Sequence, residues 1–594
     1  MKGLKISLLA AAVAVGVVGC GGSSNNDNNA STPTNTNTTA ARSISFTGVT
    51  APMTDTEKRA VRATTQVKVD GKDYSIGFRT LLRSGENIGG GTFGQLYDAA
   101  GTPIMGKDGS LRVSADSDFA SLLPVNGKLF MVSHFETRPA AMYLTELKQD
   151  TSTGALSPVQ TRHLDFAGVR GGWVHCAGSV TPWNTHLGSE EYPPDARAVN
   201  PITGSIDNDG NYYNVMAEYY GGNLLTLNPY DYGYQIEVKV NAFDNATVTK
   251  HYSMGRIAHE LGKVMPNQKT VYMSDDGGNG VMLRYEADKA GDLSSGELFA
   301  AKWNQTSKAN GGAANLTWVS LGKATDAEIK TYLDSKLKFA DIFDAETANA
   351  DGTCPGTASG FKSVNTGSGG LECLKLKTGM EKAASRLETR RYAALLGATT
   401  EFNKMEGITI DPATKLLYVA MSSIEKSMLN ADKTDVGGPN HIQLDKNSCG
   451  TVFGLQLDDN YVAKTMSAVI SGAASTSGDA VNTCDLNTIA NPDNVTFMPG
   501  YKTLIIGEDT GTGHQNDALW CYNIESKVLT RLLTTPYGSE TTSPYFYPDI
   551  NGWSYLMAVV QHPYGESDAD KLVAGSGEDR AYTGYIGPFP SMKN

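Results

Sequence analysis

The segment 176–192, CAGSVTPWNTHLGSEEY, brings together residue types that bind metal ions. Cys176 can supply a soft thiolate ligand, and the adjacent Glu190 and Glu191 can supply hard carboxylate ligands. A site that uses both kinds suits a transition metal next to a calcium-like ion. Taken alone, the segment is better explained as a buried cysteine in a strand, followed by an exposed pair of glutamates, than as a metal site. The metal-site interpretation therefore depends on the rest of the chain.

Further acidic residues stand at the ends of predicted strands: Glu260, Asp275, Asp276, Glu406, Glu508 and Asp509. Any one of them could be an ordinary solvated turn residue. Gathered at one place, however, like charges repel unless cations bind between them. Because these residues are far apart in the sequence, they can meet only if several strands bring their ends to one axis.

Five segments have the pattern of β-hairpins: 122–134, 264–276, 408–422, 495–509 and 545–561. In each, two apolar strands flank a tight turn that contains Pro, Asp, Gly or Asn. Hairpins dispersed in this way predict an all-β fold, in particular a β-propeller whose blades surround a central mouth. Acidic strand ends would meet at that mouth.

The stretch 323–396 departs from this pattern. Residues 325–343 have the apolar spacing of a helix, and Thr325 with Glu328 forms a capping-box pattern. We therefore expect a mostly helical insertion in the β domain. Its role could equally be that of a lid or of a packing brace.

The N-terminus is typical of a lipoprotein signal peptide over residues 1–20. Its apolar run is too short to span a bilayer, and VVGC at 17–20 is a lipobox pattern with Cys20 as the lipidated residue. An ordinary secretory signal is the alternative. Residues 21–69 are expected to be a disordered tether and lead-in, followed by the structured domain over 70–594. These features predict an extracytoplasmic protein, anchored to a bacterial membrane (the outer membrane or the cell surface) through lipid on Cys20.

The net charge of −13 argues against a nucleic-acid partner, which would need a basic face.

The cysteine content agrees with an extracytoplasmic compartment. Cys354 and Cys373 flank a Gly- and Ser-rich loop and are expected to form a disulfide, which by loop closure would contribute roughly 3 kcal/mol. Pairing among Cys449, Cys484 and Cys521 stays open.

In this context the segment 176–192 resembles the signature of the PhoX-type alkaline phosphatases, a family of secreted calcium- and iron-dependent phosphatases built on a β-propeller. Further similar motifs occur in the family's order: TLLRSGE at 80–86, LFMVSHFE at 129–136, YDYGYQIEV at 230–238, GRIAHE at 255–260, VYMSDD at 271–276, RRYAALLGAT at 390–399, KMEGITIDP at 404–412, NPDNVTFMPGYKTLIIGEDTG at 491–511 and VVQHPYGES at 559–567. The resemblance extends from about residue 75 to the C-terminus. It implies six blades, Ca²⁺ and Fe³⁺ as cofactors, and hydrolysis of small phosphate monoesters.

Carried over residue by residue, the resemblance implies three groups of metal-binding positions: Cys176, Glu260 and Glu406; the paired acids Glu190 and Glu191, of which at least one is a ligand; and the less certain Asp493, Asn494, Glu508 and Asp509.

One position departs from the family. Its members usually have Arg two residues before the glutamate matched by Glu406, and this chain has Lys404. Arg binds phosphate oxygens bidentately, whereas Lys offers a point charge. We expect Lys404, together with Arg256, to hold the phosphate, with an altered substrate range or affinity.

Two other functions remain open from the sequence. A calcium-dependent lactonase or phosphotriesterase would not need Cys176, and a non-catalytic surface lipoprotein would not need the acidic residues. The chain contains no GxSxG, Walker or HExxH motif, so serine hydrolase, NTPase and zinc protease functions lack support. We expect the protein to act as a monomer.

Overall fold

The computed structural model describes residues 42–593, apart from 208–211, 356–358, 368 and 566–571. They belong to one compact unit that begins at Arg42. The predicted signal peptide, Cys20 and the first part of the expected tether lie outside the described residues. Residues 42–69 belong to the compact unit, so the structured body begins before residue 70, where we expected it.

The predicted all-β class is confirmed, because antiparallel sheets are the main regular structure of the described residues and helices are few and short. Two four-stranded sheets come first, one of β8 (Ser117–Val125), β9 (Lys128–Phe135), β10 (Ala141–Gln149) and β11 (Leu156–His163), the other of β12 (Ser179–Val180), β13 (His186–Gly188), β14 (Gln235–Ala242) and β15 (Asn245–His251). A nine-stranded sheet follows, and it has two halves. The first half contains β16 (His259–Val264), β17 (Thr270–Asp275), β18 (Leu283–Lys289), β19 (Asp292–Ser307) and β20 (Ala313–Thr325), and the second contains β24 (Met405–Asp411), β25 (Leu416–Met421), β26 (Thr451–Leu457) and β27 (Ala463–Ser471). Pairing of β20 with β27 joins the two halves.

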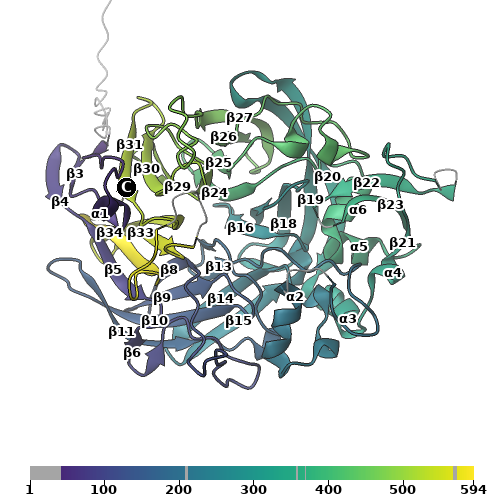
Figure 1. Ribbon diagram of the computed structural model, residues 1–594, viewed down its shortest axis with the longest axis horizontal. Coiled ribbons are helices and arrows are strands. Elements are labelled where there is room, and N and C mark those ends of the chain that lie inside the picture. The colour runs from purple at the N-terminus through teal and green to yellow at the C-terminus, as the bar shows by residue number, and fades with distance from the viewer. Residues whose placement is uncertain (1–41, 208–211, 356–358, 368, 566–571, 594) are drawn as a thin grey trace, which may run out of the picture. The chain divides into compact units, whose positions relative to one another are not determined.

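The last two large sheets draw strands from both ends of the chain. One contains β28 (Pro492–Met498), β29 (Thr503–Glu508), β30 (Ala518–Asn523) and β31 (Leu529–Thr534), with β2 (Arg62–Ala63) at its edge. The other contains β32 (Glu540–Ile550), β33 (Trp553–Gln561) and β34 (Tyr582–Pro590), completed by β5 (Phe78–Arg83). The small sheets are β1 (Ile44–Phe46), β3 (Gln66–Val69) and β4 (Lys72–Ser75), and the pair β6 (Asn87–Ile88) and β7 (Gly91–Thr92). Figure 1 shows the large sheets around a common centre, with β8, β13, β16 and β24 near the middle.

All five predicted hairpins are confirmed. They are the strand pairs β8–β9, β16–β17, β24–β25, β28–β29 and β32–β33. Asn126 and Gly127 join β8 to β9 with φ angles of 51° and 78°, as a tight turn between right-twisted strands requires. The short pair β12 and β13 was not predicted, because strands of two or three residues leave almost no periodic signal.

The core lies between neighbouring sheets. Leu123 and Phe130 of the first sheet pack with Ile236 and Val238 of the second. Strands β24–β27 pack in the same way on β28–β31. Strands β24 and β28 are buried at every position, since other elements cover both of their faces.

The prediction of a mostly helical insertion over 323–396 is wrong in part. Helices occur at both ends, as α3 (Asp326–Asp334) and α4 (Phe339–Ile342), and as α5 (Glu381–Leu387) and α6 (Thr389–Leu395). The middle is a sheet of β21 (Phe343–Glu346), β22 (Lys362–Thr366) and β23 (Gly370–Leu376). The Gly- and Ser-rich middle has low helix propensity, and its strands pair instead. The insertion is packed into the core through Ile329 and Leu387, as a brace would be.

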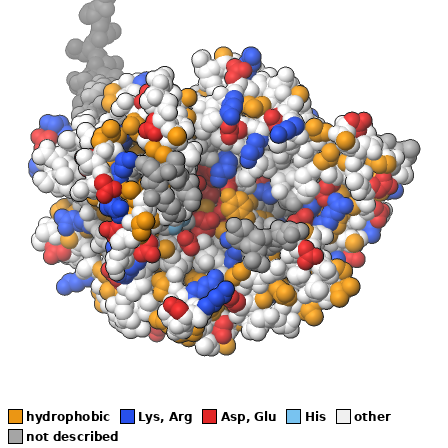
Figure 2. All heavy atoms as spheres, in the orientation of Figure 1, with side chains coloured by type: hydrophobic (Ala, Val, Ile, Leu, Met, Phe, Trp, Pro, Cys, Tyr) orange, Lys and Arg blue, Asp and Glu red, His pale blue; other side chains and the backbone are white. Residues whose placement is uncertain are grey.

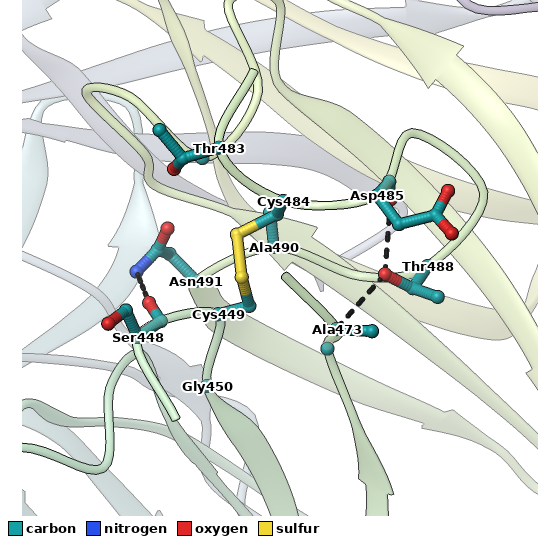
Figure 3. The surroundings of a disulfide bond; sticks show 12 residues. Ser448, Cys449, Gly450, Ala473, Thr483, Cys484, Asp485, Thr488, Ala490 and Asn491 are labelled. Carbon is teal, nitrogen blue, oxygen red and sulfur yellow. Dashed lines mark hydrogen bonds between the residues drawn. A yellow bond between two sulfur atoms is a disulfide. The ribbon is translucent and has the colours of Figure 1, made fainter. Parts of the chain in front are cut away.

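The predicted capping box of Thr325 and Glu328 and the Cys354–Cys373 disulfide are confirmed. A second disulfide joins Cys449 to Cys484 (Figure 3), while Cys176 and Cys521 are free and buried. The remaining α-helices are α1 (Asp55–Lys58) and α2 (Tyr212–Val215). Within the described part of the chain, no helix has the length and apolar character needed to cross a membrane.

Candidate metal centre

The carboxylates of the site are aimed by β-bulges at the start of the innermost strands. In β16, pairing with β17 is interrupted between His259 and Gly262, around Glu260. The ladder of β24 is interrupted in the same way around Glu406, and that of β28 around Asp493. A bulge leaves residues out of the ladder and re-aims their side chains, here toward the common centre. Strand β8 repeats the device at Asp118.

A second set of side chains follows the neighbouring strand of each hairpin. Glu136 comes directly after β9, Asp276 after β17 and Asp509 after β29. Because antiparallel partners run in opposite directions, the end of the second strand lies beside the start of the first. The two sets therefore converge, and Figure 2 shows acidic side chains in a hollow near the centre of this face.

Together these residues line a pocket of about 350 Å³. Of the residues predicted for the site, the pocket is lined by Cys176, Glu191, Glu260, Lys404, Glu406, Asp493 and Asp509. Asp276, one of the acidic strand ends expected at the central mouth, also lines the pocket. The other lining residues were not predicted for the site: Asp116, Asp118, Glu136, Tyr192, Glu540, Gln561 and His562. Sequence motifs far apart in the chain thus meet at one place, as the metal-site interpretation required.

Cys176 lies at the centre of two possible ligand groups. Its Sγ is 3.0 Å from Glu260 Oε2 and 3.6 Å from Asp118 Oδ2. Ligand atoms of Cys176, Glu191 and Glu260 lie within 4.8 Å of one another, as do those of Cys176, Asp118 and Glu136. A third group of the same kind, made of Glu260, Glu406 and Asp493, offers oxygen alone.

Lys404 is the cation of the pocket. Its Nζ is 3.0 Å from Asp276 Oδ2 and 3.2 Å from Glu406 Oε1. The residue has a left-handed backbone with φ of 52°, held by its N–H bond to the carbonyl of Gly277. Such strain in a non-glycine residue persists only where the surroundings hold it, and it occurs often at functional sites.

The electrostatics of the pocket favour bound cations. Burial is the largest cause that raises the pKa values of Asp118, Glu191, Glu260, Glu406 and Glu540 well above the usual range, and neighbouring carboxylates add to it. Burial likewise raises the pKa of Asp493 to about 8 and that of the Cys176 thiol well above its usual value. Carboxylates in such numbers keep their charge in a buried place only when cations balance it.

Asp276 behaves differently from the other carboxylates. Burial acts to raise its pKa, but Lys404, Glu191 and Tyr192 outweigh that effect and hold the pKa below the usual value. Its Oδ2 accepts hydrogen bonds from Lys404 and Tyr192. Its Oδ1 is buried and has no hydrogen-bond partner among the described residues. A buried carboxylate oxygen that lacks a donor fits a metal ligand.

Four predicted residues do not line the pocket, and their hydrogen bonds explain why. Glu190 accepts bonds from the backbone N–H of Trp173 and Gly233 and pairs with the buried Lys250 at 2.8 Å. The Glu190 carboxylate is therefore engaged in hydrogen bonds and an ion pair inside the core. Of the paired acids at 190 and 191, only Glu191 faces the pocket.

Glu508 is used in the same way as Glu190, because it accepts bonds from the backbone of Ala490 and Ala518 and from the Trp520 indole. Asp509, the next residue, faces the pocket.

Arg256 donates to backbone carbonyls, among them those of Tyr232 and Pro229 at 2.8 and 3.0 Å. It braces the chain behind the site and does not face the phosphate position we predicted for it. Asn494 lies beside the pocket, where its Nδ2 donates to Glu260 Oε1 at 3.3 Å. Asn494 therefore orients Glu260.

The family model of alkaline phosphatase PhoX matches residues 142–564. A search of curated proteins found no similar sequence. Among solved structures, Pseudomonas fluorescens PhoX in complex with vanadate, a transition state analogue, is 17% identical, with a TM-score of 0.59, and the match covers 92% of this chain and 98% of that chain. A putative 6-phosphogluconolactonase from Bacteroides uniformis is 11% identical, with a TM-score of 0.28, over 74% of this chain and 90% of that chain.

Proposed function

The chain belongs to the PhoX family of alkaline phosphatases, and from this premise we propose that it hydrolyses phosphate monoesters with calcium and iron bound in the acidic pocket. The observation that carries the proposal is the meeting of Cys176, Glu260 and Glu406 in one buried pocket. These are the positions at which the sequence matches the family's metal-binding residues. Glu260 and Glu406 stand on β16 and β24, the two outer strands of the nine-stranded sheet, and Cys176 lies in the loop before β12, so the pocket exists only in the folded chain.

We also propose that the fold is a six-bladed β-propeller. Six antiparallel groups of strands follow one another along the described chain, if the nine-stranded sheet is divided where β20 pairs with β27. Pairing of β5 with β34 joins the two ends of the chain, which is how a propeller closes its ring. Strands β8, β16 and β24, each the first strand of its group, lie near the centre in Figure 1.

The donor sets support two kinds of metal ion. Cys176 with Glu191 and Glu260 combines a thiolate with carboxylates and suits Fe³⁺, whereas Glu260 with Glu406 and Asp493 offers the oxygen ligands that Ca²⁺ prefers. When bound, such ions would neutralise the negative charge on the phosphoryl oxygens and polarise the ester. Glu260 belongs to both sets and would bridge them.

The chain's own side chains have separate tasks in the pocket. Lys404 would hold one phosphoryl oxygen by charge, and its pairing with Asp276 and Glu406 fixes where its ammonium lies. Tyr192 donates a hydrogen bond from its hydroxyl to Asp276 and borders the pocket. The substrate would thereby be oriented with its phosphate among the carboxylate ligands and beside Lys404.

The proposal includes an extracytoplasmic place for the enzyme, with a lipid on Cys20 and a monomeric state. The lipobox at 17–20 carries the location. The two disulfides agree with an oxidising compartment, where such bonds persist.

The test combines hydrolysis of p-nitrophenyl phosphate with metal analysis of the purified protein. A chelator should abolish hydrolysis, and calcium should restore it better than magnesium, which demands a tighter octahedral site. Iron and calcium together support the phosphatase. Calcium alone, with no phosphomonoester turnover, would favour a lactonase or phosphotriesterase, and the absence of tightly bound metal would favour a binding protein.

A further inference from the structure

A second cavity opens directly beside the metal centre. It has a volume of about 1030 Å³, against about 350 Å³ for the pocket, and both are lined by Lys404 and Asp509. Ten of the fifteen residues that line the small pocket are carboxylates, so this pocket suits bound cations and a phosphate and leaves little space for an alcohol group. A phosphate placed beside Lys404 would therefore direct its alcohol group into the larger cavity, which we call the side groove.

The side groove is built from polar side chains. Ser and Thr hydroxyls occur along it, including Ser423, Ser448 and Thr483, together with the amides of Asn447 and Asn491. Among the described residues that line it, none is aromatic. Hydroxyl groups exchange hydrogen bonds with the hydroxyls of a sugar or another polyol, whereas the Nδ2 groups of Asn447 and Asn491 donate to backbone carbonyls of the groove walls. Nucleobases are held largely by stacking on aromatic rings, which these walls do not offer.

One carboxylate gives the groove a strong acceptor. Glu425 lines it, and its Oε1 accepts bonds of 2.8 Å from both Ser448 Oγ and Lys446 Nζ. The Glu425 side chain keeps an exposed fraction of 27%. Hydrogen bonds from neutral hydroxyls to an ionised carboxylate are stronger than those between neutral groups. Glu425 is thus suited to accept from the hydroxyls of a bound alcohol.

The walls of the groove are fixed before any substrate binds. Asn491 Nδ2 donates to the carbonyls of Ser422 and Ser448, at 2.8 and 3.0 Å. Figure 3 shows the bond of Asn491 to Ser448 beside the disulfide that joins Cys449 to Cys484. A preformed site loses less conformational entropy on binding than a flexible one.

We propose that the side groove binds the alcohol portion of the substrate and that it favours polyhydroxylated alcohols, such as sugars, over small alcohols and nucleosides. The proposal rests on the proposed phosphatase function and adds the substrate class. Specificity then depends on Glu425 and on the space along the groove, while the metal centre acts on the phosphate alone.

The test uses three esters of primary alcohols: methyl phosphate, glucose 6-phosphate and adenosine 5′-monophosphate. Their leaving groups have similar chemistry, so differences in kcat/KM report contacts with the alcohol portion. Glucose 6-phosphate should exceed methyl phosphate by about tenfold or more, as one charged hydrogen bond provides. It should also exceed the adenosine ester.

Two variants locate the effect in the groove. Glu425→Gln and the groove-filling Ala474→Leu should each lower kcat/KM for glucose 6-phosphate by about tenfold and leave methyl phosphate within about twofold. Ala474 lines the groove, whereas its exposed neighbour Ala473 does not, so Ala473→Leu is the matched control and should change neither substrate.

The possible outcomes distinguish failure of the groove assignment from failure of the proposed phosphatase function. Equal kcat/KM values for all three esters, or equal losses for methyl and glucose phosphates in the two variants, would overturn the groove assignment and leave the phosphatase standing. Preference for the adenosine ester would overturn the polyol class. If no ester, including p-nitrophenyl phosphate, is hydrolysed by metal-replete protein, the proposed function fails, and the groove assignment fails with it.

Discussion

Replacing His251 by Gln should make the enzyme less stable at neutral pH but not at high pH. His251 ends β15 and is almost fully buried between two carboxylates. Its Nε2 lies 3.0 Å from Glu237 Oε2 and its Nδ1 3.2 Å from Asp326 Oδ2, at the start of α3. Burial acts to lower the pKa of His251, but these two partners outweigh it and raise the pKa to about 9. The imidazolium therefore links the second sheet to the insertion.

The magnitude follows from proton linkage. The folded-state pKa of about 9 lies above the value of 6.5 for a free histidine, so the folded protein keeps a proton that the unfolded chain releases between these values. The stabilisation is complete below pH 6.5 and is lost as the pH rises through 9. It amounts to about 3 kcal/mol at low pH, about 2.5 kcal/mol at pH 7 and nearly zero by pH 10.

The assay is urea unfolding of wild type and His251→Gln between pH 6 and 10. The difference in unfolding free energy should be largest at pH 6 and vanish near pH 10. His163→Gln is the matched control, because His163 stacks on Tyr97 and burial lowers its pKa. That variant should leave the slope above pH 7 unchanged. Parallel stability curves for wild type and His251→Gln over the whole range would refute the reasoning.

Three further predictions concern single side chains and one disulfide. Cys176→Ser should lose bound iron and at least about 100-fold in activity, since a hydroxyl is a poor ligand for iron; full iron content would contradict this. Glu508→Gln should cost about 2–4 kcal/mol in unfolding free energy through its lost backbone bonds, whereas Asp509→Asn should cost activity and no stability; equal stability of the two would argue against separate roles. Replacing Cys354 and Cys373 by Ser should lower stability by about 3 kcal/mol and leave kcat/KM unchanged; loss of activity in the folded variant would show that the insertion acts on the site.

The hairpins and the main acidic residues could be predicted because both depend on local pattern. A tight turn between two apolar strands is visible in the sequence, and Glu260 and Glu406 stand at the beginning of such strands. The residues that were missed had the same signal. Asp118 begins β8 and Glu136 follows β9, in the positions that Glu260 and Asp276 occupy around β16 and β17. Aligning the predicted hairpins with one another would have found both.

The side groove could not be predicted, because its walls come from separate connections between strands. Ser423 and Glu425 follow β25, while Asn491 precedes β28 and Thr510 follows β29. None of these residues stands in a recognisable motif. The disulfide between Cys449 and Cys484, which fixes one wall, was equally open from sequence, since pairing depends on the distance between connections in the fold.

The paired acids show why sequence alone assigned some residues wrongly. Three adjacent pairs border the pocket: Glu190 with Glu191, Asp275 with Asp276, and Glu508 with Asp509. In each pair the second carboxylate lines the pocket, and the first turns into the core and accepts backbone N–H groups.

Successive side chains of an extended backbone point to opposite sides, so both members of a pair cannot face the same ion. The first carboxylate, such as Asp275 held by Arg390 of α6, fixes the backbone from which the second projects. In each acidic pair of this chain, the second carboxylate is therefore the candidate metal ligand, and the first holds the backbone in place. Once the end of the strand is known, the order of the two residues in the sequence tells which is which.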